Sequence, residues 1–193
     1  MVQGPYRPSS FLLDRRSAWP AMAVCAALLA CSTGTTSGLP GFDRPQAELF
    51  SVFGAQPNAW ADYDGDGDLD LFVGFRGREN RLYRNDAGVF VDVADAVGLA
   101  AQPSPTAEAR AAAWGDFDGD GDLDLYVGFT ERPRTSVRDR LYRNEDGGAR
   151  FVDVSAEVGV NVVGVTRQPA FVDFDGDGDL DLFVALRDQA NRL

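Results

Sequence analysis

An acidic segment that occurs three times constrains the fold more than any other feature of this sequence. Its first copy, residues 62–70, reads Asp-Tyr-Asp-Gly-Asp-Gly-Asp-Leu-Asp, and near-identical copies occupy residues 116–124 and 173–181. Carboxylates this close repel one another, and burying them together would drive them to take up protons. A bound divalent cation reverses that balance because it becomes the largest local charge. The segment therefore predicts a cation-binding loop.

The spacing of the carboxylates favours calcium. Ca²⁺ takes about six to eight oxygen ligands in flexible geometry, whereas Mg²⁺ prefers near-octahedral geometry with several waters. We expect side-chain ligands at loop positions 1, 3, 5 and 9, a backbone carbonyl at position 7, and about one ion per loop. Gly67, at the sixth position, should adopt a positive φ, and the carboxylate of Asp68 should turn toward solvent. The predicted side-chain ligands are Asp62, Asp64, Asp66 and Asp70; Asp116, Asp118, Asp120 and Asp124; and Asp173, Asp175, Asp177 and Asp181, with carbonyl ligands from Asp68, Asp122 and Asp179.

Two alternatives to this loop type can be weighed from the sequence. An EF-hand shares the early ligand positions but requires a bidentate Glu at position 12 and flanking helices. Position 12 is occupied here by Val73, Val127 and Val184, each within an apolar run, so the EF-hand is excluded. The other alternative is a solvated acidic turn without metal, and three near-identical copies argue against it.

The loops mark a repeat with strands on both sides of each loop. The first aspartates are separated by 54 residues, from Asp62 to Asp116, and then by 57 residues, to Asp173. Alternating apolar residues follow each loop, as in the run at 69–75, where Phe72 lies on the face opposite its neighbours. This period of two indicates strands, and a strand that is apolar on both faces needs cover on both.

Two further strands complete each repeat. The segments at 80–85 and 139–144 contain Leu-Tyr-Arg-Asn, and Phe-Val-Asp-Val follows at 90–93 and 151–154. Glycines at 88 and 147–148 indicate hairpin turns between these strands. Four strands in about fifty residues match a β-propeller blade. We therefore expect an all-β fold over residues 49–193, an incomplete β-propeller of four-stranded blades with calcium loops.

These motifs resemble a known family. The loop and its strands are similar to FG-GAP/VCBS repeats, the calcium-loop propeller repeats of integrin α type. The added Leu-Tyr-Arg-Asn and Phe-Val-Asp-Val segments resemble the repeats of ASPIC/UnbV-type secreted proteins. The resemblance covers residues from about 55 to the end. It implies a calcium-stabilised propeller module.

The first 48 residues have a different composition. A polar, arginine-containing start precedes an apolar run at 18–30, which is too short to span a bilayer but suits a signal peptide. The run ends in Leu-Leu-Ala-Cys at 28–31, which resembles the lipobox of bacterial lipoproteins and would make Cys31 a lipid anchor. A plain secretory signal is one alternative, and a segment that is neither kind of signal is the other. Residues 32–48 read as a flexible linker. We expect an exported protein of the bacterial cell envelope, or a secreted one.

Composition narrows the possible functions. The net charge of −12 argues against a nucleic-acid partner, because phosphate binding needs a basic surface. There is no His, so Ser-His and Cys-His catalytic arrangements are absent. Carboxylates clustered around Ca²⁺ stay ionised and cannot shuttle protons, so no catalytic residue and no enzymatic activity are predicted. A cofactor other than Ca²⁺ is not expected either.

The remaining features leave the partner open. The second repeat contains a five-residue insertion, and this segment carries Arg132, Pro133, Arg134, Arg138 and Arg140; it is read either as a contact surface for an anionic partner or glycan or as a solvated loop. The third copy stops at residues 191–193, in register with 80–82, so we expect a longer protein to continue beyond it. The predicted function is a calcium-binding surface module for protein or glycan interaction. The alternatives are the non-catalytic part of a longer surface enzyme and a sugar-binding propeller.

Overall fold

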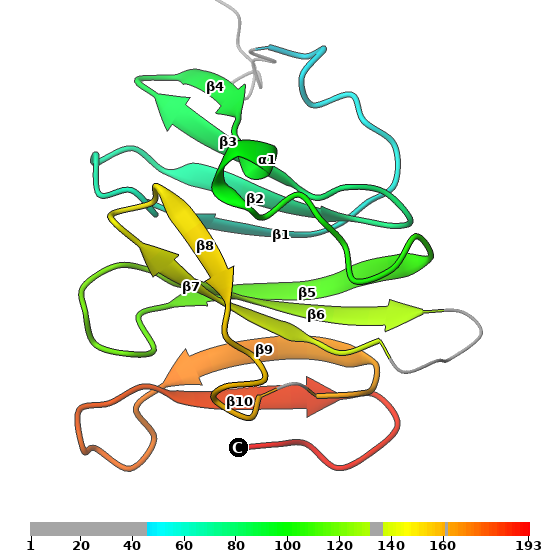
Figure 1. Cartoon of the computed structure of the whole chain (residues 1–193), viewed down its shortest axis with the longest axis vertical. Helices are drawn as coiled ribbons and strands as arrows, with labels where there is room; N and C mark the ends of the chain where they lie inside the picture. The colour runs from blue at the N-terminus through cyan, green and yellow to red at the C-terminus, as the bar shows by residue number, and fades with distance from the viewer. Residues whose placement is uncertain (1–45, 132–136, 161) are drawn as a thin grey trace, which may run out of the picture. The chain divides into compact units, whose positions relative to one another are not determined.

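Two four-stranded antiparallel sheets and one two-stranded sheet make up the computed structural model (Figure 1). The structure describes residues 46–131, 137–160 and 162–193, which lie within the unit Asp43–Leu193. The first sheet contains β1 (Ala55–Ala61), β2 (Asp70–Phe75), β3 (Arg81–Asp86) and β4 (Val89–Asp92); the second contains β5 (Ala107–Gly115), β6 (Asp124–Glu131), β7 (Arg140–Glu145) and β8 (Arg150–Asp153); the third contains β9 (Thr166–Val172) and β10 (Asp181–Leu186).

The strand order confirms the predicted all-β, propeller-like fold. Each complete sheet is a meander in which neighbours along the chain pair antiparallel. The same register recurs in each repeat: Val73 pairs with Arg81, Val127 with Arg140, and Val184 forms a bridge with Arg192. The repeated sequence is therefore a repeated pairing scheme.

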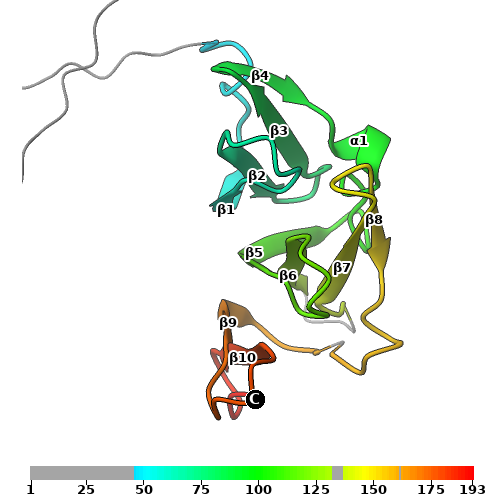
Figure 2. The same cartoon turned by 90° about the vertical axis from the view of Figure 1, so that its left-hand side faces the viewer.

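The sheets face one another and share two cores. The first strands of the sheets, β1, β5 and β9, lie in contact along one side (Figure 2). Phe72 and Leu82 of the first sheet are buried in the same core as Phe129 of the second. Tyr126, on the other face of β6, packs with Val184 of the third sheet. The prediction that these central strands are covered on both faces is thus confirmed, and every residue of β2 is buried.

Glycines set the distance between the sheets. A Cβ at Gly74 would lie 2.5 Å from the Cβ of Ala109 in the neighbouring sheet, and a Cβ at Gly128 would lie 2.6 Å from Thr166. Any larger residue would push the sheets apart, because packed interiors have no room for an extra methyl group.

A segment before β1 covers the remaining face of the first sheet. Leu49 and Val52 pack on the buried residues Leu71, Val73, Phe75 and Tyr83. Tyr83 donates its hydroxyl proton to the carbonyl of Leu49 (3.2 Å). In the second sheet the corresponding residues lie in the core shared with the first sheet. The segment thus occupies a face that in the next repeat is covered by a sheet.

Two local features differ from the sequence-based expectation. A one-turn helix, α1 (Ala94–Val97), follows β4 and ends at Gly98 with φ 90°. It went unpredicted because a single turn is too short to show helical periodicity. Leu69, expected on the buried face of the strand after the first loop, precedes β2 and is 57% exposed.

Several predictions fall on residues that the structure does not describe. These are the signal segment at 1–31 with Cys31, the linker up to residue 45, and the inserted Arg132, Pro133 and Arg134. Within the described ranges, the structure contains no helix with the length and apolar character of a membrane span.

Candidate metal centres

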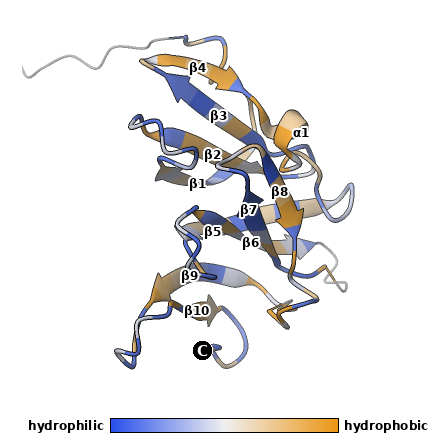
Figure 3. Ribbon diagram, turned by 60° about the vertical axis from the view of Figure 1, so that its left-hand side comes forward, coloured by the Kyte–Doolittle hydropathy of each residue, from blue (hydrophilic) through white to orange (hydrophobic). Residues whose placement is uncertain are grey.

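Each acidic segment forms the loop between the first two strands of its sheet, as predicted. The loops run from β1 to β2, from β5 to β6 and from β9 to β10, and they leave the sheets at the same end (Figure 1). Colouring by hydropathy shows them as mainly hydrophilic (Figure 3). The carboxylates that open each loop are therefore gathered at one end of the sheets, outside the two cores.

In every loop, three carboxylates each place an oxygen within 4.8 Å of the others. The first and third loop positions contribute in all three loops. The third member is the position-5 residue in the first loop and the position-9 residue in the other two. The groups are Asp62, Asp64 and Asp66; Asp116, Asp118 and Asp124; and Asp173, Asp175 and Asp181. Of the predicted side-chain ligands, Asp70, Asp120 and Asp177 lie outside these groups.

The loop backbone curls around its first aspartate. The N–H of Gly67 donates to Asp62 Oδ2 (3.0 Å), and the same bond joins Gly121 to Asp116 (3.0 Å) and Gly178 to Asp173 (3.2 Å). Gly67 has the predicted positive φ, 96°. Only glycine adopts this conformation without steric cost, so the turn depends on the Asp-Gly alternation.

Two carboxylate oxygens of the first loop are buried without a hydrogen-bond donor. They are Asp62 Oδ1 and Asp64 Oδ1, among the few such side-chain atoms in the described part of the chain. Leaving a buried charged oxygen unsatisfied costs more than about 1–3 kcal/mol. A cation bound between them would supply the missing partner, and a set of hard carboxylate oxygens suits Ca²⁺. The residues present therefore fit the ion that the sequence predicts.

The electrostatics of the loop carboxylates point the same way. Burial raises the pKa of Asp70 to about 6, although backbone N–H donors oppose it. Burial likewise raises the pKa of Asp124 to about 6. The pKa values of Asp64 and Asp118 are also raised, first by burial and then by the neighbouring carboxylates. Without a cation the charged state of these groups is thus disfavoured, and a divalent cation would stabilise it.

The position-9 aspartate ties the loop to the third strand. Asp70 is fully buried; its Oδ2 accepts the N–H of Tyr63 (3.1 Å) and its Oδ1 accepts the N–H of Asn85 (2.8 Å). Asp124 accepts the N–H groups of Phe117 (2.9 Å) and Asn144 (2.8 Å) in the same way. This aspartate therefore holds the loop against the β3–β4 or β7–β8 hairpin.

The position-7 carboxylate differs from the prediction. Asp68 was expected to turn its carboxylate toward solvent, but Oδ2 accepts the N–H of Ala87 in the β3–β4 turn (2.8 Å). In the second loop, Asp122 Oδ2 accepts the N–H of Gly147 (2.9 Å). The reason is tertiary: the turn of the next hairpin presents an unpaired N–H next to the loop.

Sequence reasoning also missed two asparagines. Asn85 Nδ2 donates to the carbonyl of Leu69 (3.1 Å), and Asn144 Nδ2 donates to that of Leu123 (3.2 Å). Each side chain thus fixes the residue before the position-9 aspartate. The available signal was the repeated Asn that closes both Leu-Tyr-Arg-Asn segments, a polar residue kept at the end of a strand.

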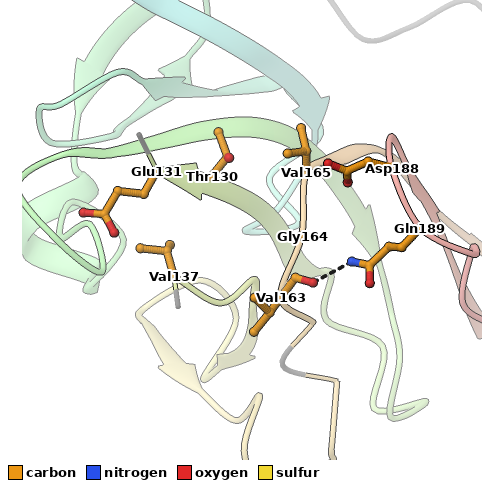
Figure 4. A pocket seen from close by; sticks show the side chains of 8 residues that line it. All are labelled: Thr130, Glu131, Val137, Val163, Gly164, Val165, Asp188 and Gln189. Carbon is orange, nitrogen blue, oxygen red and sulfur yellow. Dashed lines mark hydrogen bonds between the residues drawn. The ribbon is translucent and has the colours of Figure 1, made fainter. Parts of the chain in front are cut away.

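A hollow of about 240 Å³ lies at the other end of β6 (Figure 4). Three valines line it together with Thr130, Glu131, Asp188 and Gln189. Gln189 donates its amide to the carbonyl of Val163 (2.6 Å), and Glu131 accepts a hydrogen bond from Ser104 (2.7 Å). Two of its polar groups thus serve contacts within the fold, so the acidic loops remain the better candidate site.

Comparison with known proteins agrees with this geometry. Residues 62–127 match the sequence model of the FG-GAP-like repeat. The match begins at the first aspartate of the first loop and includes the whole second loop. No curated protein matches the chain. Together with the all-β, propeller-like fold, the match at residues 62–127 supports an FG-GAP-like repeat protein.

Proposed function

We propose that this chain is a calcium-binding, non-catalytic propeller module that acts at the cell surface or outside the cell by binding a protein or glycan. The observation that carries the calcium assignment is the pair of buried, unpartnered oxygens on Asp62 and Asp64. The clustered carboxylates at the same positions of the other two loops support it. FG-GAP-like repeats are interaction modules of the integrin type, which supports a binding role.

The ion's role in this module is structural. Each loop joins two neighbouring strands, and its ninth residue is hydrogen-bonded to the third strand in both complete sheets. A cation held by the loop carboxylates would offset their mutual repulsion and fix the connection between strands. Carboxylates that hold a cation stay ionised, so they are unsuited to proton transfer. This chemistry favours a stabilising site over a catalytic one.

Export of the protein is part of the proposal. It rests on the apolar segment and the Leu-Leu-Ala-Cys sequence at 28–31, and on the similarity of the repeats to ASPIC/UnbV-type secreted proteins. Mass spectrometry of the mature N-terminus tests it. A lipid-modified Cys31 is expected for a lipoprotein, and an unprocessed Met1 would contradict export through this segment.

Thermal unfolding with calcium or with a chelator tests the metal assignment. A site filled at 100 times its Kd stabilises the folded state by about 2.7 kcal/mol. For a chain of this size each kcal/mol raises Tm by about 2–4 °C. We therefore expect calcium to raise Tm by several degrees.

The matched control removes one clustered carboxylate, with its ligand oxygens, from each loop: Asp64→Ala, Asp118→Ala and Asp175→Ala together. This variant should show no calcium-dependent change in Tm. Equal melting of the unaltered protein in calcium and in chelator would refute the assignment.

A further inference from the structure

The β7–β8 hairpin of the second sheet is bound to the calcium loop of its own sheet. Asn144 donates its backbone N–H to Asp124 Oδ1 (2.8 Å) and its Nδ2 to the carbonyl of Leu123 (3.2 Å). Gly147 donates its N–H to Asp122 Oδ2 (2.9 Å). Three consecutive residues of the second loop, 122–124, are thus held by this one hairpin.

The same hairpin also contacts the calcium loop of the first sheet. Asn144 Nδ2 donates to the carbonyl of Tyr63 (2.9 Å), the second residue of the first loop. At Gly148, a Cβ would lie 2.7 Å from the ring of Tyr63 and 2.8 Å from the Cβ of Asp64. The hairpin therefore lies directly against Asp64, whose Oδ1 is one of the two unpartnered buried oxygens.

Asn144 is well suited to transmit a change between the loops. Its side chain is fully buried, and all its polar groups are used. One Nδ2 proton goes to each loop, and Oδ1 accepts the N–H of Gly148 (2.8 Å). A buried amide with every group paired has one favourable orientation, so moving one of its partners disturbs the others.

The first sheet provides a natural comparison. Asn85 makes the same bonds within its own sheet: to Leu69 (3.1 Å), to Asp70 (2.8 Å) and from Gly88 (2.7 Å). Within the part of the chain that the structure describes, its recorded hydrogen bonds all stay in that sheet. A Cβ at Gly88 would meet no atom within 4 Å. The Asn144 hairpin thus differs from the Asn85 hairpin by its contact with a second loop.

We infer that the first two calcium loops are coupled through the 144–148 hairpin, with Asn144 as the positioning residue, so that filling either loop raises the calcium affinity of the other. This inference rests on the proposed calcium binding. Filling the first loop fixes the Tyr63 carbonyl and the Asp64 side chain, which orders the hairpin; the hairpin then holds residues 122–124 in place. The second loop then loses less conformational entropy when it binds calcium, so its affinity rises. Coupling of this kind is reciprocal.

Calorimetric titration with calcium tests the coupling. The third loop is disabled throughout by Asp175→Ala, which removes a ligand oxygen. Adding Asp118→Ala leaves only the first loop active, and adding Asp64→Ala instead leaves only the second. If the loops are coupled, the protein with both loops active should bind at least about fivefold more tightly than the sum of the two single-loop isotherms predicts, the lower end of typical coupling.

The positioning role of Asn144 is tested in the same three proteins: the one with both loops active and the two with a single active loop. With Asn144→Ala, the two-loop isotherm should equal the sum of its own single-loop isotherms, whereas with Asn85→Ala the excess affinity should persist. A second pair compares Gly148→Ala with Gly88→Ala, which impose similar backbone strain at φ 87° and 89°. Only Gly148→Ala should abolish coupling. This pair keeps both asparagines, and a thermal melt of each variant confirms that it is folded.

The outcomes separate the inference from the proposed function. Additive isotherms for the two loops in the protein with Asn144 intact would overturn the coupling while leaving calcium binding in place. Equal loss of coupling in the Asn85 and Asn144 variants would overturn the role of the inter-sheet contact. If neither single-loop protein bound calcium, the proposed function itself would be overturned, and the coupling with it.

Discussion

Asp139 should make the stability of this protein depend on pH, independently of the acidic loops. Its side chain is buried between the second and third sheets at the start of the Leu-Tyr-Arg-Asn segment. Oδ1 accepts the N–H of Phe129 (2.7 Å), and Oδ2 accepts the hydroxyl groups of Tyr126 (2.8 Å) and Thr166. Burial outweighs these three hydrogen bonds and raises the pKa of Asp139 from 3.8 to about 6.

The size of the effect follows from that pKa. Because the folded-state pKa is raised, the protonated acid favours folding, and its contribution is fully present below about pH 3.8 and lost as pH rises through about 6. At about 1.4 kcal/mol per pH unit, the charged carboxylate costs the folded state about 3 kcal/mol at pH 7 relative to pH 3. Asp139→Asn removes the titration but keeps an acceptor for Phe129.

Urea unfolding of both proteins in saturating calcium, from pH 4 to pH 7.5, measures this cost. As pH rises from 4 to 7.5, the free energy of unfolding of Asp139→Asn should increase by about 2–3 kcal/mol relative to that of the unaltered protein. The measured quantity is the change with pH of the difference in unfolding free energy between the two proteins. The lost hydroxyl contacts add a constant to that difference, and the loop carboxylates titrate alike in both proteins, so neither contributes to the change. A difference between the two proteins that stays flat with pH would refute the reasoning.

The repeat itself supplies a control. The other two repeats have asparagine at the position of Asp139. Asn80 Oδ1 accepts the N–H of Phe75 (3.3 Å), and Asn191 Oδ1 accepts that of Leu186 (3.0 Å). The amide is therefore compatible with this position, and the reverse change, Asn80→Asp, should introduce an extra loss of stability as pH rises.

Three further substitutions test the packing and the loops. Gly74→Ala places a Cβ 2.5 Å from the next sheet and should lower the free energy of unfolding, measured in urea, by about 1–3 kcal/mol; unchanged stability would show that the sheets can move apart. Trp114 donates its ring N–H to the carbonyl of Ala59 in the first sheet (3.2 Å), so Trp114→Ala should lower the free energy of unfolding by about 3 kcal/mol. Trp60 is 51% exposed, so Trp60→Ala should cost less than half as much; equal losses would contradict a role of Trp114 between the sheets. Asp122→Ala removes the acceptor of the Gly147 N–H and should lower the free energy of unfolding by about 1 kcal/mol in the same assay, whereas Asp122→Asn keeps an acceptor and should lose much less. Equal stability of Asp122→Ala and the unaltered protein would show that this bond contributes nothing.

Features that depend on neighbours along the chain were predictable. The four strands of each complete repeat, the strand-to-strand loops and the hairpin turns follow from the period of two and from the positions of glycine. The positive φ of Gly67 and the grouping of the first and third carboxylates of each loop follow from the loop pattern itself. Local backbone geometry fixes these features within about ten residues.

Contacts between distant segments were not predictable from one sequence. Gln46 lies in a stretch that reads as a linker, yet its side-chain amide pairs with both the N–H and the carbonyl of Phe90 (2.7 and 2.9 Å). The carboxylate of Asp68 accepts a hydrogen bond from the N–H of Ala87, 19 residues later in the sequence. Composition gives no hint of either bond, because the partner is brought near only by strand pairing and sheet packing.

The sequence alone determined that the chain is built from β repeats with an acidic loop in each, since the spacing of carboxylates and glycines leaves few other structures. It could not distinguish Asn85 from Asn144, which close identical Leu-Tyr-Arg-Asn segments. Only the tertiary structure made them different, because Asn144 lies against the loop of another sheet while the recorded hydrogen bonds of Asn85 stay within its own. Identical local sequences acquire different roles when packing gives them different neighbours.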